Sequence, residues 1–458
     1  PAPPAGPQGG RPAAAAEAAA GRVPVLLLAL FLFALYTRPQ DLLPALRPLR
    51  LVFLLGAGAT AAYLADAIGR GAPLLRPARE LVLLGALLAL AALSIPFSLW
   101  PGLSARLFLD QLVKVALAAV LLAHLVDTPG RMRAVIRVLV AAGVYLAAGA
   151  LYGLASGRTA ADYAGRAAGL VGGMFGDPND LALTLVILIA LAGFEAVAAR
   201  RRSVRVVLVA AIVLMLAGFL ATYSRGGLLA LVAAGAVGLR RLSRHGRGLA
   251  VAAVSVFALA AVALAPEGYG ERAASIVQQD RDTRGSIEAR LTTLRYGVEI
   301  LLEHPFPGVG LGAFRIAEGA KHGGLGKWNE AHNAFLQVGA ELGWPGLAVY
   351  AALAVCTLAS VRAAARRATG LPEVAALAHG LETALVGFLV GAMFLSQAYT
   401  WHFYVLLGLG VAVRRLAEAA PTGAAEAAPT GVRAPAGAGR LAPPWPRRLG
   451  AEGSAGAA

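Results

Sequence analysis

Charge is scarce in this sequence: Asp, Glu, Lys and Arg make up only 14% of 458 residues, where soluble domains carry about a quarter. This scarcity and a mean hydropathy of +0.68 exclude an ordinary soluble protein. Apolar runs of membrane-spanning length recur instead, bounded by arginines. Alternating β-barrel strands are not evident, so the predicted fold is all-α and polytopic in a membrane.

Cysteine is nearly absent: the chain has one, Cys356, which lies inside an apolar run. A disulfide framework or a cysteine metal site within the chain is therefore excluded. The net charge of +16 comes from arginines at the ends of apolar runs, and no nucleic-acid motif accompanies it, so we expect no nucleic-acid partner. "DRD" (280–282) resembles a metal-binding Asp-x-Asp pair, but that motif works inside a soluble α/β domain, and we interpret it as a chance match.

Candidate spans number about twelve, and the chain divides around them. Their approximate limits are 23–37, 49–66, 80–100, 105–126, 132–154, 180–199, 204–222, 226–239, 248–265, 344–361, 375–396 and 400–414. Ends rich in Ala, Pro, Gly and Arg, 1–21 and 417–458, are expected to be disordered tails of one transmembrane domain, 22–416.

Arginine orients the spans. The loops that would be cytoplasmic with an inside N-terminus hold the main arginine groups, at 70–79, 131–137, 200–205, 240–247 and 362–367. The alternate loops are poorer in arginine, as the positive-inside rule requires, so both termini are predicted inside. This orientation places one large loop, 266–342, outside.

An amphipathic helix is predicted within that loop. In "SIEARLTTLRYGVEILLEHPF" (286–306) the apolar residues fall on one stripe, formed by Ile287, Leu291, Leu294, Val298 and Leu301. We expect this helix to lie on the bundle or on the membrane surface, to carry Arg290 at the border of its stripe, and to stop at His304-Pro305. "GVGLG" (308–312) lacks the spacing and preceding strand of a dinucleotide site, and is predicted to be a turn.

Unusual polar residues gather on the predicted outer side. They are Asn179, Asp180, Arg225, Arg290, His332 and Asn333, together with Arg106, Asp110 and Lys114 on one face of the fourth span. Arginine suits a phosphate because its planar group binds two oxygens at once. Histidine suits proton abstraction near neutral pH. A pocket that combines them fits a transferase acting on a lipid phosphate donor.

Each of these residues also has a structural interpretation. His332 could be a helix cap or a surface group, Arg225 a snorkelling anchor and Arg290 a solvated side chain. "DPND" (177–180) fits an N-cap and turn at the start of the sixth span. The charges of the fourth span fit a self-neutralising ladder inside the bundle, and they could also supplement the pocket.

The sequence resembles the bacterial O-antigen ligase and polymerase superfamily. The resemblance rests on "TYSRGGLLAL" (222–231), on Arg290 fifteen residues before the Pro of "HPFPGVGLGAF" (304–314), and on "AHNAFLQVGAELGWPGL" (331–347). "FGDPNDLA" (175–182) and "YTRPQDLLPALRPLRL" (36–51) are also typical of its members. One departure from the family pattern is Leu294, where members often have Trp four residues after the loop arginine.

The resemblance implies a membrane glycosyltransferase-C-like fold of about twelve helices with a large periplasmic loop. It implies transfer of a glycan from undecaprenyl pyrophosphate, without metal, nucleotide or other cofactor, at the periplasmic face of the inner membrane. His332 is then the base that activates the acceptor hydroxyl, and Arg225 and Arg290 bind the pyrophosphate. Asn333, Asn179 and Asp180 complete the expected substrate-binding set. The acceptor, whether glycan, lipid A-core or protein, stays open.

A polysaccharide or lipid-linked oligosaccharide transporter is the rival class, and a non-catalytic assembly partner is a third. Transporters often show internal repeats and broken helices at the membrane midplane. No repeat is evident here, and the polar residues gather at one face, which favours the transferase.

Overall fold

The structure is a computed structural model that describes residues 21–157, 166–169, 176–242, 286–324, 328–368 and 370–419. Within these ranges all regular elements are helical and no strand occurs. The predicted all-α polytopic fold is therefore confirmed. The predicted span at 248–265 and the acidic pair Asp280 and Asp282 lie outside the described residues.

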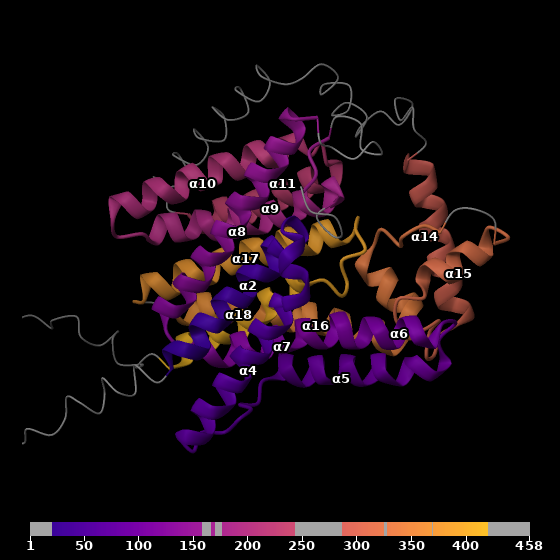
Figure 1. Ribbon diagram of the computed structural model, residues 1–458, viewed down its shortest axis with the longest axis horizontal. Coiled ribbons are helices and arrows are strands. Elements are labelled where there is room, and N and C mark those ends of the chain that lie inside the picture. The colour runs from indigo at the N-terminus through magenta and orange to yellow at the C-terminus, as the bar shows by residue number, and fades with distance from the viewer. Residues whose placement is uncertain are drawn as a thin grey trace, which may run out of the picture. The chain divides into compact units, whose positions relative to one another are not determined.

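The bundle is built from helices that follow the predicted spans closely (Figure 1). In chain order they are α2 (Arg22–Thr37), α3 (Pro39–Leu42), η1 (Pro44–Leu49), α4 (Leu51–Gly69), α5 (Arg79–Ser94), η2 (Ile95–Phe97), α6 (Pro101–Leu107), η3 (Phe108–Leu112), α7 (Val113–Leu125), α8 (Pro129–Ala155), α9 (Pro178–Ala198), α10 (Arg202–Ala221), α11 (Arg225–Arg241), α14 (Ser286–Glu303), α15 (Phe314–Lys321), α16 (Ala334–Arg367), α17 (Pro372–Ala392) and α18 (Trp401–Glu418).

Eight helical segments among the described residues have the length and apolar character to cross a membrane. They are Pro44–Gly69, Arg79–Phe97, Pro101–Leu125, Pro129–Ala155, Pro178–Ala198, Arg202–Ala221, Ala334–Arg367 and Pro372–Ala392. The full count of twelve spans stays a prediction. In α16 the chain kinks at Gly343, whose φ of 71° is left-handed, so residues 334–342 form a separate helical piece before the predicted span at 344–361.

Burial separates central from peripheral helices. The apolar window of α9 is 78% buried, whereas that of α10 is only 28% buried, although both helices are strongly apolar. A helix that is apolar all round belongs in the centre of a bundle or against lipid. Large side chains of α10 and α5 that point outwards, such as Val207 and Val82, therefore mark the surface that faces the bilayer.

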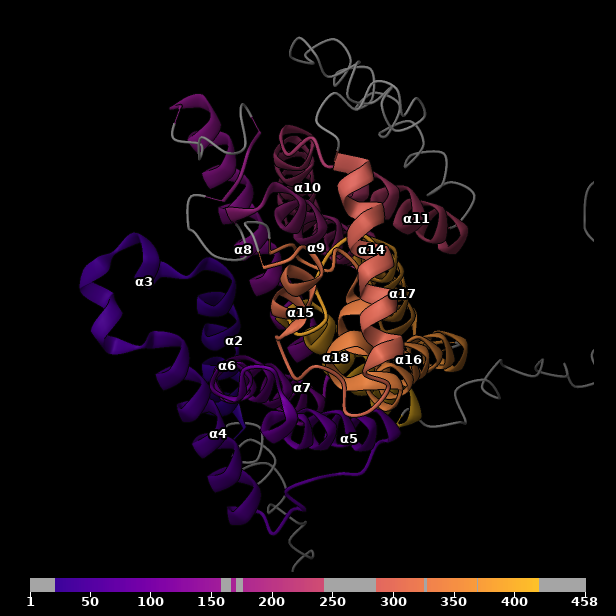
Figure 2. The same cartoon turned by 90° about the vertical axis from the view of Figure 1, so that its right-hand side faces the viewer.

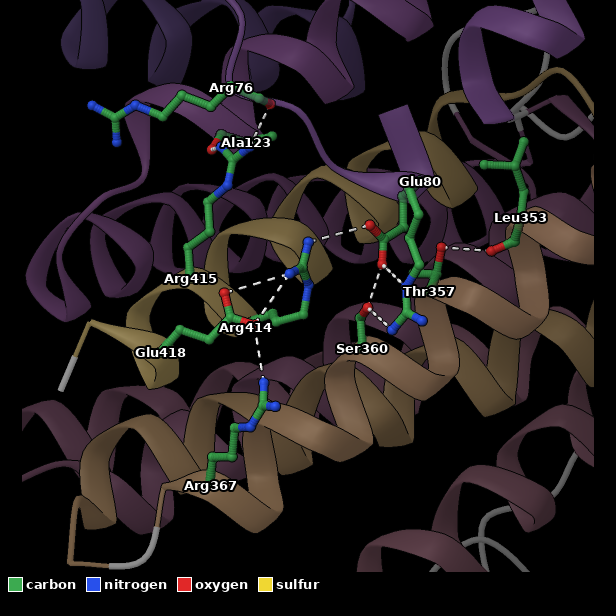
Figure 3. Close-up of polar contacts among 11 residues, drawn as sticks. Arg76, Glu80, Ala123, Leu353, Thr357, Ser360, Arg367, Arg414, Arg415 and Glu418 are labelled. Carbon is green, nitrogen blue, oxygen red and sulfur yellow. Dashed lines mark hydrogen bonds and ion pairs between the residues drawn. The ribbon is translucent and has the colours of Figure 1, made fainter. Parts of the chain in front are cut away.

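At one end of the helices, buried carboxylates are paired with arginines. Glu80 of α5 is fully buried, accepts a hydrogen bond from Ser360 of α16 and pairs with Arg414 of α18 at 3.4 Å (Figure 3). Arg414 and Arg367 both contact Glu418 in the same view. Buried charge is costly unless it is paired, and here the pairing ties three helices together.

Two further carboxylates at the arginine-rich helix ends follow the same rule. Glu195 of α9 accepts from Arg137 of α8 at 2.6 Å, and Glu382 of α17 is held by Arg241 of α11 and Arg362 of α16 at 2.9 and 2.8 Å. These arginines belong to the groups that the sequence analysis assigns to the cytoplasmic side. Their partners give these clusters a structural role.

The opposite ends of the helices meet the described part of the large loop. In Figures 1 and 2, α14 and α15 lie side by side, and both contact α16. The Leu99 N–H donates to the Val309 carbonyl at 3.0 Å, and the Ser104 hydroxyl donates to the Leu311 carbonyl at 2.7 Å. The loop is thus fixed to the bundle through its backbone carbonyls, by one backbone and one side-chain donor.

The predicted amphipathic helix exists as α14 and ends at Glu303, but its buried face differs from the predicted stripe. Leu291, Leu294 and Val298 are exposed. Gly297 faces the bundle instead, because a Cβ there would lie 2.5 Å from Leu336 of α16. A glycine lets two helices approach closely, and Leu301 of the predicted stripe is buried on the same helix together with Thr293 and Ile300, so the prediction holds only for the end of the stripe. The exposed stripe fits the predicted alternative of contact with the membrane surface.

The glycine turn at 308–312 is confirmed. It forms a wedge, packed between the first piece of α16 and the connection from α5 to α6. Gly308, Gly310 and Gly312 all have positive φ, of 83°, 98° and 75°. The Val309 and Gly310 N–H groups donate to the carbonyls of Ala340 and Glu341 at 3.0 and 2.9 Å. On its other side the turn meets the end of α5 and the start of α6, and it thereby fixes the first piece of α16.

A matched pair of glycine variants tests the wedge. A Cβ at Gly310 would lie 2.2 Å from the side chain of Ser98, whereas Gly323 has a positive φ with open space around it. We expect Gly323→Ala to lower the free energy of unfolding by about 1–2 kcal/mol, which is the penalty for a left-handed backbone at a residue other than glycine. Gly310→Ala should cost about 1–3 kcal/mol more, because the neighbours must also move. Thermal unfolding in detergent measures the stability of both variants. Equal losses of stability would contradict close packing of the turn at Gly310.

Candidate active site

His332 lies in a sharp turn immediately before α16. Its backbone is left-handed, with φ 48°, a region that histidine, asparagine and aspartate enter more readily than most residues. Its N–H donates to the Ser396 hydroxyl at 2.9 Å. Asn333 is the N-cap of α16, and its side chain accepts from the N–H groups of Phe335 and Leu336 at 3.0 Å each. The histidine is thus fixed on both sides.

A buried carboxylate holds the segment that leads into this turn. Glu318 of α15 is fully buried, and its Oε2 accepts from the Asn329 N–H at 2.9 Å. Its Oε1 accepts from the Asn329 side-chain amide at 2.8 Å and contacts Nε2 of His322 at 2.9 Å. The large loop therefore positions His332 through α15 as well as through α16.

Two charged residues act on the imidazole of His332. Burial and the Arg290 guanidinium hold the pKa of His332 below its ordinary value, and the Asp177 carboxylate opposes them. Arg290 comes from α14 and Asp177 from the start of α9, so both lie within electrostatic range of the histidine. A histidine with a lowered pKa is neutral at neutral pH and can accept a proton.

The opposing charges predict opposite shifts in the acid limb of the pH profile. If His332 must be neutral to act, activity falls as the pH drops through its pKa. Arg290→Gln removes a cation that lowers this pKa, so the limb should move to higher pH. Asp177→Asn removes an anion that raises it, so the limb should move to lower pH, while Asn still caps α9. Profiles of kcat/KM measure both, and shifts of the same sign would contradict the assignment.

The start of α9 is organised by the "DPND" turn. Asp177 is the N-cap of α9 as predicted, and its Oδ1 accepts from the Asn179 N–H at 2.6 Å. Arg166 donates to the Asn179 side chain at 2.9 Å and to the Thr222 carbonyl at 2.8 Å, so it ties α9 to the end of α10. Asp180 accepts from the Gln397 amide at 2.6 Å.

Arg225 is the first residue of α11, just after a capping serine. Ser224 accepts from the Gly227 N–H at 3.1 Å, and Arg225 itself is half-buried. A Cβ at Gly226 would lie 3.2 Å from Cβ of Phe394, in the connection between α17 and α18. The same connection contributes Ser396 and Gln397. It therefore contacts the starts of α9, α11 and α16, which carry Asp180, Arg225 and His332.

The charges of the fourth span lie outside this cluster. Arg106 and Asp110 are exposed, and Asp110 pairs with Lys114 at 3.1 Å. The expectation of a charge ladder inside the bundle was therefore wrong. These charges flank the π-helical turn η3, whose polar contact with the bundle is made by Gln111: its amide donates to the Tyr399 carbonyl at 3.0 Å.

A cavity of about 370 Å³ lies beside His332, and most of its lining residues were not predicted from the sequence. Its polar lining includes Gln111, Gln337, Glu341, Tyr399 and Thr400. Polar residues inside otherwise apolar runs, such as Glu341 in "GAELG", were the available signal. In the described ranges, no three His, Cys, Asp or Glu side chains are grouped so that they could hold a metal ion.

Comparison with known proteins gives one family. Residues 210–351 match the family model described as O-antigen ligase. The matched range contains Arg225, Arg290, His332 and Glu341. No curated protein matches the chain.

Proposed function

We propose that this chain is a glycosyltransferase of the O-antigen ligase superfamily that uses undecaprenyl pyrophosphate as its glycan carrier, and the family match over residues 210–351 supports this proposal. The chain is a multi-pass membrane protein, and the proposed reaction occurs at the periplasmic face of the bacterial inner membrane. One observation carries the proposal: the half-buried His332 lies within electrostatic range of Arg290, at the helix ends remote from the paired arginine clusters.

The proposed step is a single displacement. The acceptor hydroxyl gives its proton to the neutral imidazole of His332, and its oxygen forms a bond to the anomeric carbon of the donor glycan. The bond between that carbon and the pyrophosphate oxygen breaks, and undecaprenyl pyrophosphate leaves with the bonding electrons. Attack from the side opposite the leaving group inverts the anomeric centre.

Arg225 and Arg290 stabilise the leaving group in this proposal. Negative charge grows on the pyrophosphate as the bond breaks, so guanidinium groups placed there bind the transition state more tightly than the ground state. A pyrophosphate leaves readily as an anion, and we propose that no metal or other cofactor is required. Asn179, Asp180 and Asn333 belong to the proposed substrate-binding set, and their structural hydrogen bonds hold them in place.

The acceptor defines three versions of the proposal: lipid A-core for a ligase, a growing glycan for a polymerase, and a hydroxyl of a protein for a protein transferase. All three use the same donor and the same base. The buried cluster of acidic and basic residues at the other helix ends would suit a transporter, but each carboxylate there already has fixed arginine partners.

Reconstitution separates the transferase from the transporter. Purified full-length protein in liposomes receives lipid-linked donor and each acceptor in turn, in excess EDTA. We expect a glycosidic product with at least one acceptor and an unchanged rate without divalent ions. Movement of intact donor between leaflets with no product would favour the transporter, and activity restored only by a divalent ion would overturn metal independence.

A further inference from the structure

The cavity beside His332 shares its wall with the proposed active site. Glu330 and Ala331, the two residues before the histidine, line it, as does Ser396, which accepts the His332 N–H. Its volume of about 370 Å³ lies within the range of roughly 300–1,000 Å³ that is typical of ligand pockets. A molecule bound there would place an atom close to the base.

Two deeply buried polar groups line this cavity. Glu341 is 1% exposed and Tyr399 is 6% exposed. The two side chains are close enough to interact with each other, and neither Glu341 Oε2 nor the Tyr399 hydroxyl has a further hydrogen-bond partner within the described ranges. Buried polar atoms almost always have partners, so such a pair is a candidate for ligand contact. A ligand hydroxyl could donate to the carboxylate and accept from the phenol.

The charge of the cavity argues against phosphate. Glu330 and Glu341 contribute two carboxylates, and the single cation in the lining, Arg315, already pairs with Glu330 at 3.3 Å. A pyrophosphate would meet no unpaired cation in this lining, whereas Arg225 and Arg290, the two arginines assigned to it, do not line the cavity. The cavity therefore suits a neutral ligand and is distinct from the arginines assigned to the pyrophosphate.

The remaining lining suits a sugar. Gln111 and Gln337 supply amides, and Phe314 and Tyr399 supply aromatic rings. A sugar presents several hydroxyls as donors and acceptors together with apolar C–H faces, so amides and rings recognise it without a charge. Gln337 is held by the Ala398 N–H at 3.4 Å, and Gln111 by its bond to the Tyr399 carbonyl, so both amides are already oriented.

We infer that this cavity is the acceptor site and binds a neutral sugar unit between Glu341, Tyr399 and Gln111, with its reacting hydroxyl directed to His332. The inference rests on the proposed transferase function and assigns the half of the site that the arginines do not explain. It also accounts for a polar lining built from α6–η3, α16 and the α17–α18 connection.

Equilibrium binding to the purified full-length chain tests the inference without turnover. The probes are two soluble glycans, the delipidated repeat unit and the delipidated core oligosaccharide, and inorganic pyrophosphate as the anionic probe. Leu103 lines the cavity, whereas Leu109 of the following η3 is exposed and does not. Leu103→Trp fills the cavity, Leu109→Trp is its matched control, and Tyr399→Phe removes one hydroxyl.

We expect the wild type to bind at least one glycan, and Leu103→Trp to weaken that binding tenfold or more. Tyr399→Phe should weaken it about three- to tenfold, as the loss of one hydrogen bond allows. Leu109→Trp should change nothing, and pyrophosphate affinity should stay within twofold in all variants. No glycan binding by wild type, unchanged glycan binding in Leu103→Trp, or a loss of pyrophosphate binding instead, would each overturn the inference.

The two proposals fail differently. If wild type makes no glycosidic product but Leu103→Trp loses glycan binding, the transferase is wrong and the sugar site stands. If product forms and glycan binding is unchanged in the cavity variants, the acceptor site lies elsewhere and the transferase proposal is retained.

Discussion

His332→Asn should abolish glycan transfer while leaving the affinity for the donor lipid within a few-fold of wild type. General-base catalysis typically contributes about 10²–10⁴ in rate, so the loss belongs to turnover and not to binding. Asparagine is the chosen replacement because residue 332 has a positive φ of 48°, which asparagine tolerates and alanine does not. Its amide cannot act as a base at neutral pH.

A backbone control accompanies this variant. His332→Gly also accepts the positive φ and keeps the N–H that donates to Ser396. Initial rates and donor titrations of both variants should agree: transfer is lost and donor binding is kept. Normal product formation by His332→Asn would remove His332 from the mechanism.

Arg225→Lys should cost most of the activity even though it keeps the positive charge. An ammonium cannot make the two parallel hydrogen bonds by which a guanidinium holds a pyrophosphate. Loss of one charge-assisted bond is worth about 1.5–3 kcal/mol, which predicts a decrease of roughly 10- to 100-fold in kcat/KM. Arg290→Ala should go further, weakening donor binding as well as turnover, because it removes the charge.

Arg106→Lys is the matched control for Arg225→Lys. Arg106 is an exposed arginine at the start of the fourth span, on the same predicted side of the membrane. Its replacement should leave kcat/KM within about twofold, as expected for a solvated charge. Equal losses in both variants would show that general charge at this face, and not a pyrophosphate contact, controls the rate.

The fold was largely predictable from sequence because its main signals are local. Apolar runs and the arginines between them correspond to helices such as α9 and α10, and "DPND" and "GVGLG" became the predicted cap and turn. His332, Arg225 and Asp180 also stood out locally, as polar residues at helix ends. Their common contact, the connection between α17 and α18, was not visible in the sequence.

Packing and long-range contacts could not be predicted. On α14, Gly297 packs closely against Leu336 of α16, a contact that hydrophobic periodicity does not indicate. The cavity joins Gln111 to Tyr399 across 288 positions, and within the π-helical turn η3 Gln111 contacts the bundle whereas Asp110 is exposed. Such contacts arise from tertiary structure, so the proposed acceptor site could be identified only in the folded protein.

A single-turnover experiment with labelled lipid-linked donor tests the central claim most directly. Enzyme in excess over donor is mixed with acceptor, and released undecaprenyl pyrophosphate, the new glycosidic linkage and its anomeric configuration are determined in the same sample. Direct displacement with His332 as the base predicts one lipid pyrophosphate released for each inverted linkage, and neither product with His332→Asn. A retained linkage, or equal yields from His332→Asn and wild type, would contradict it.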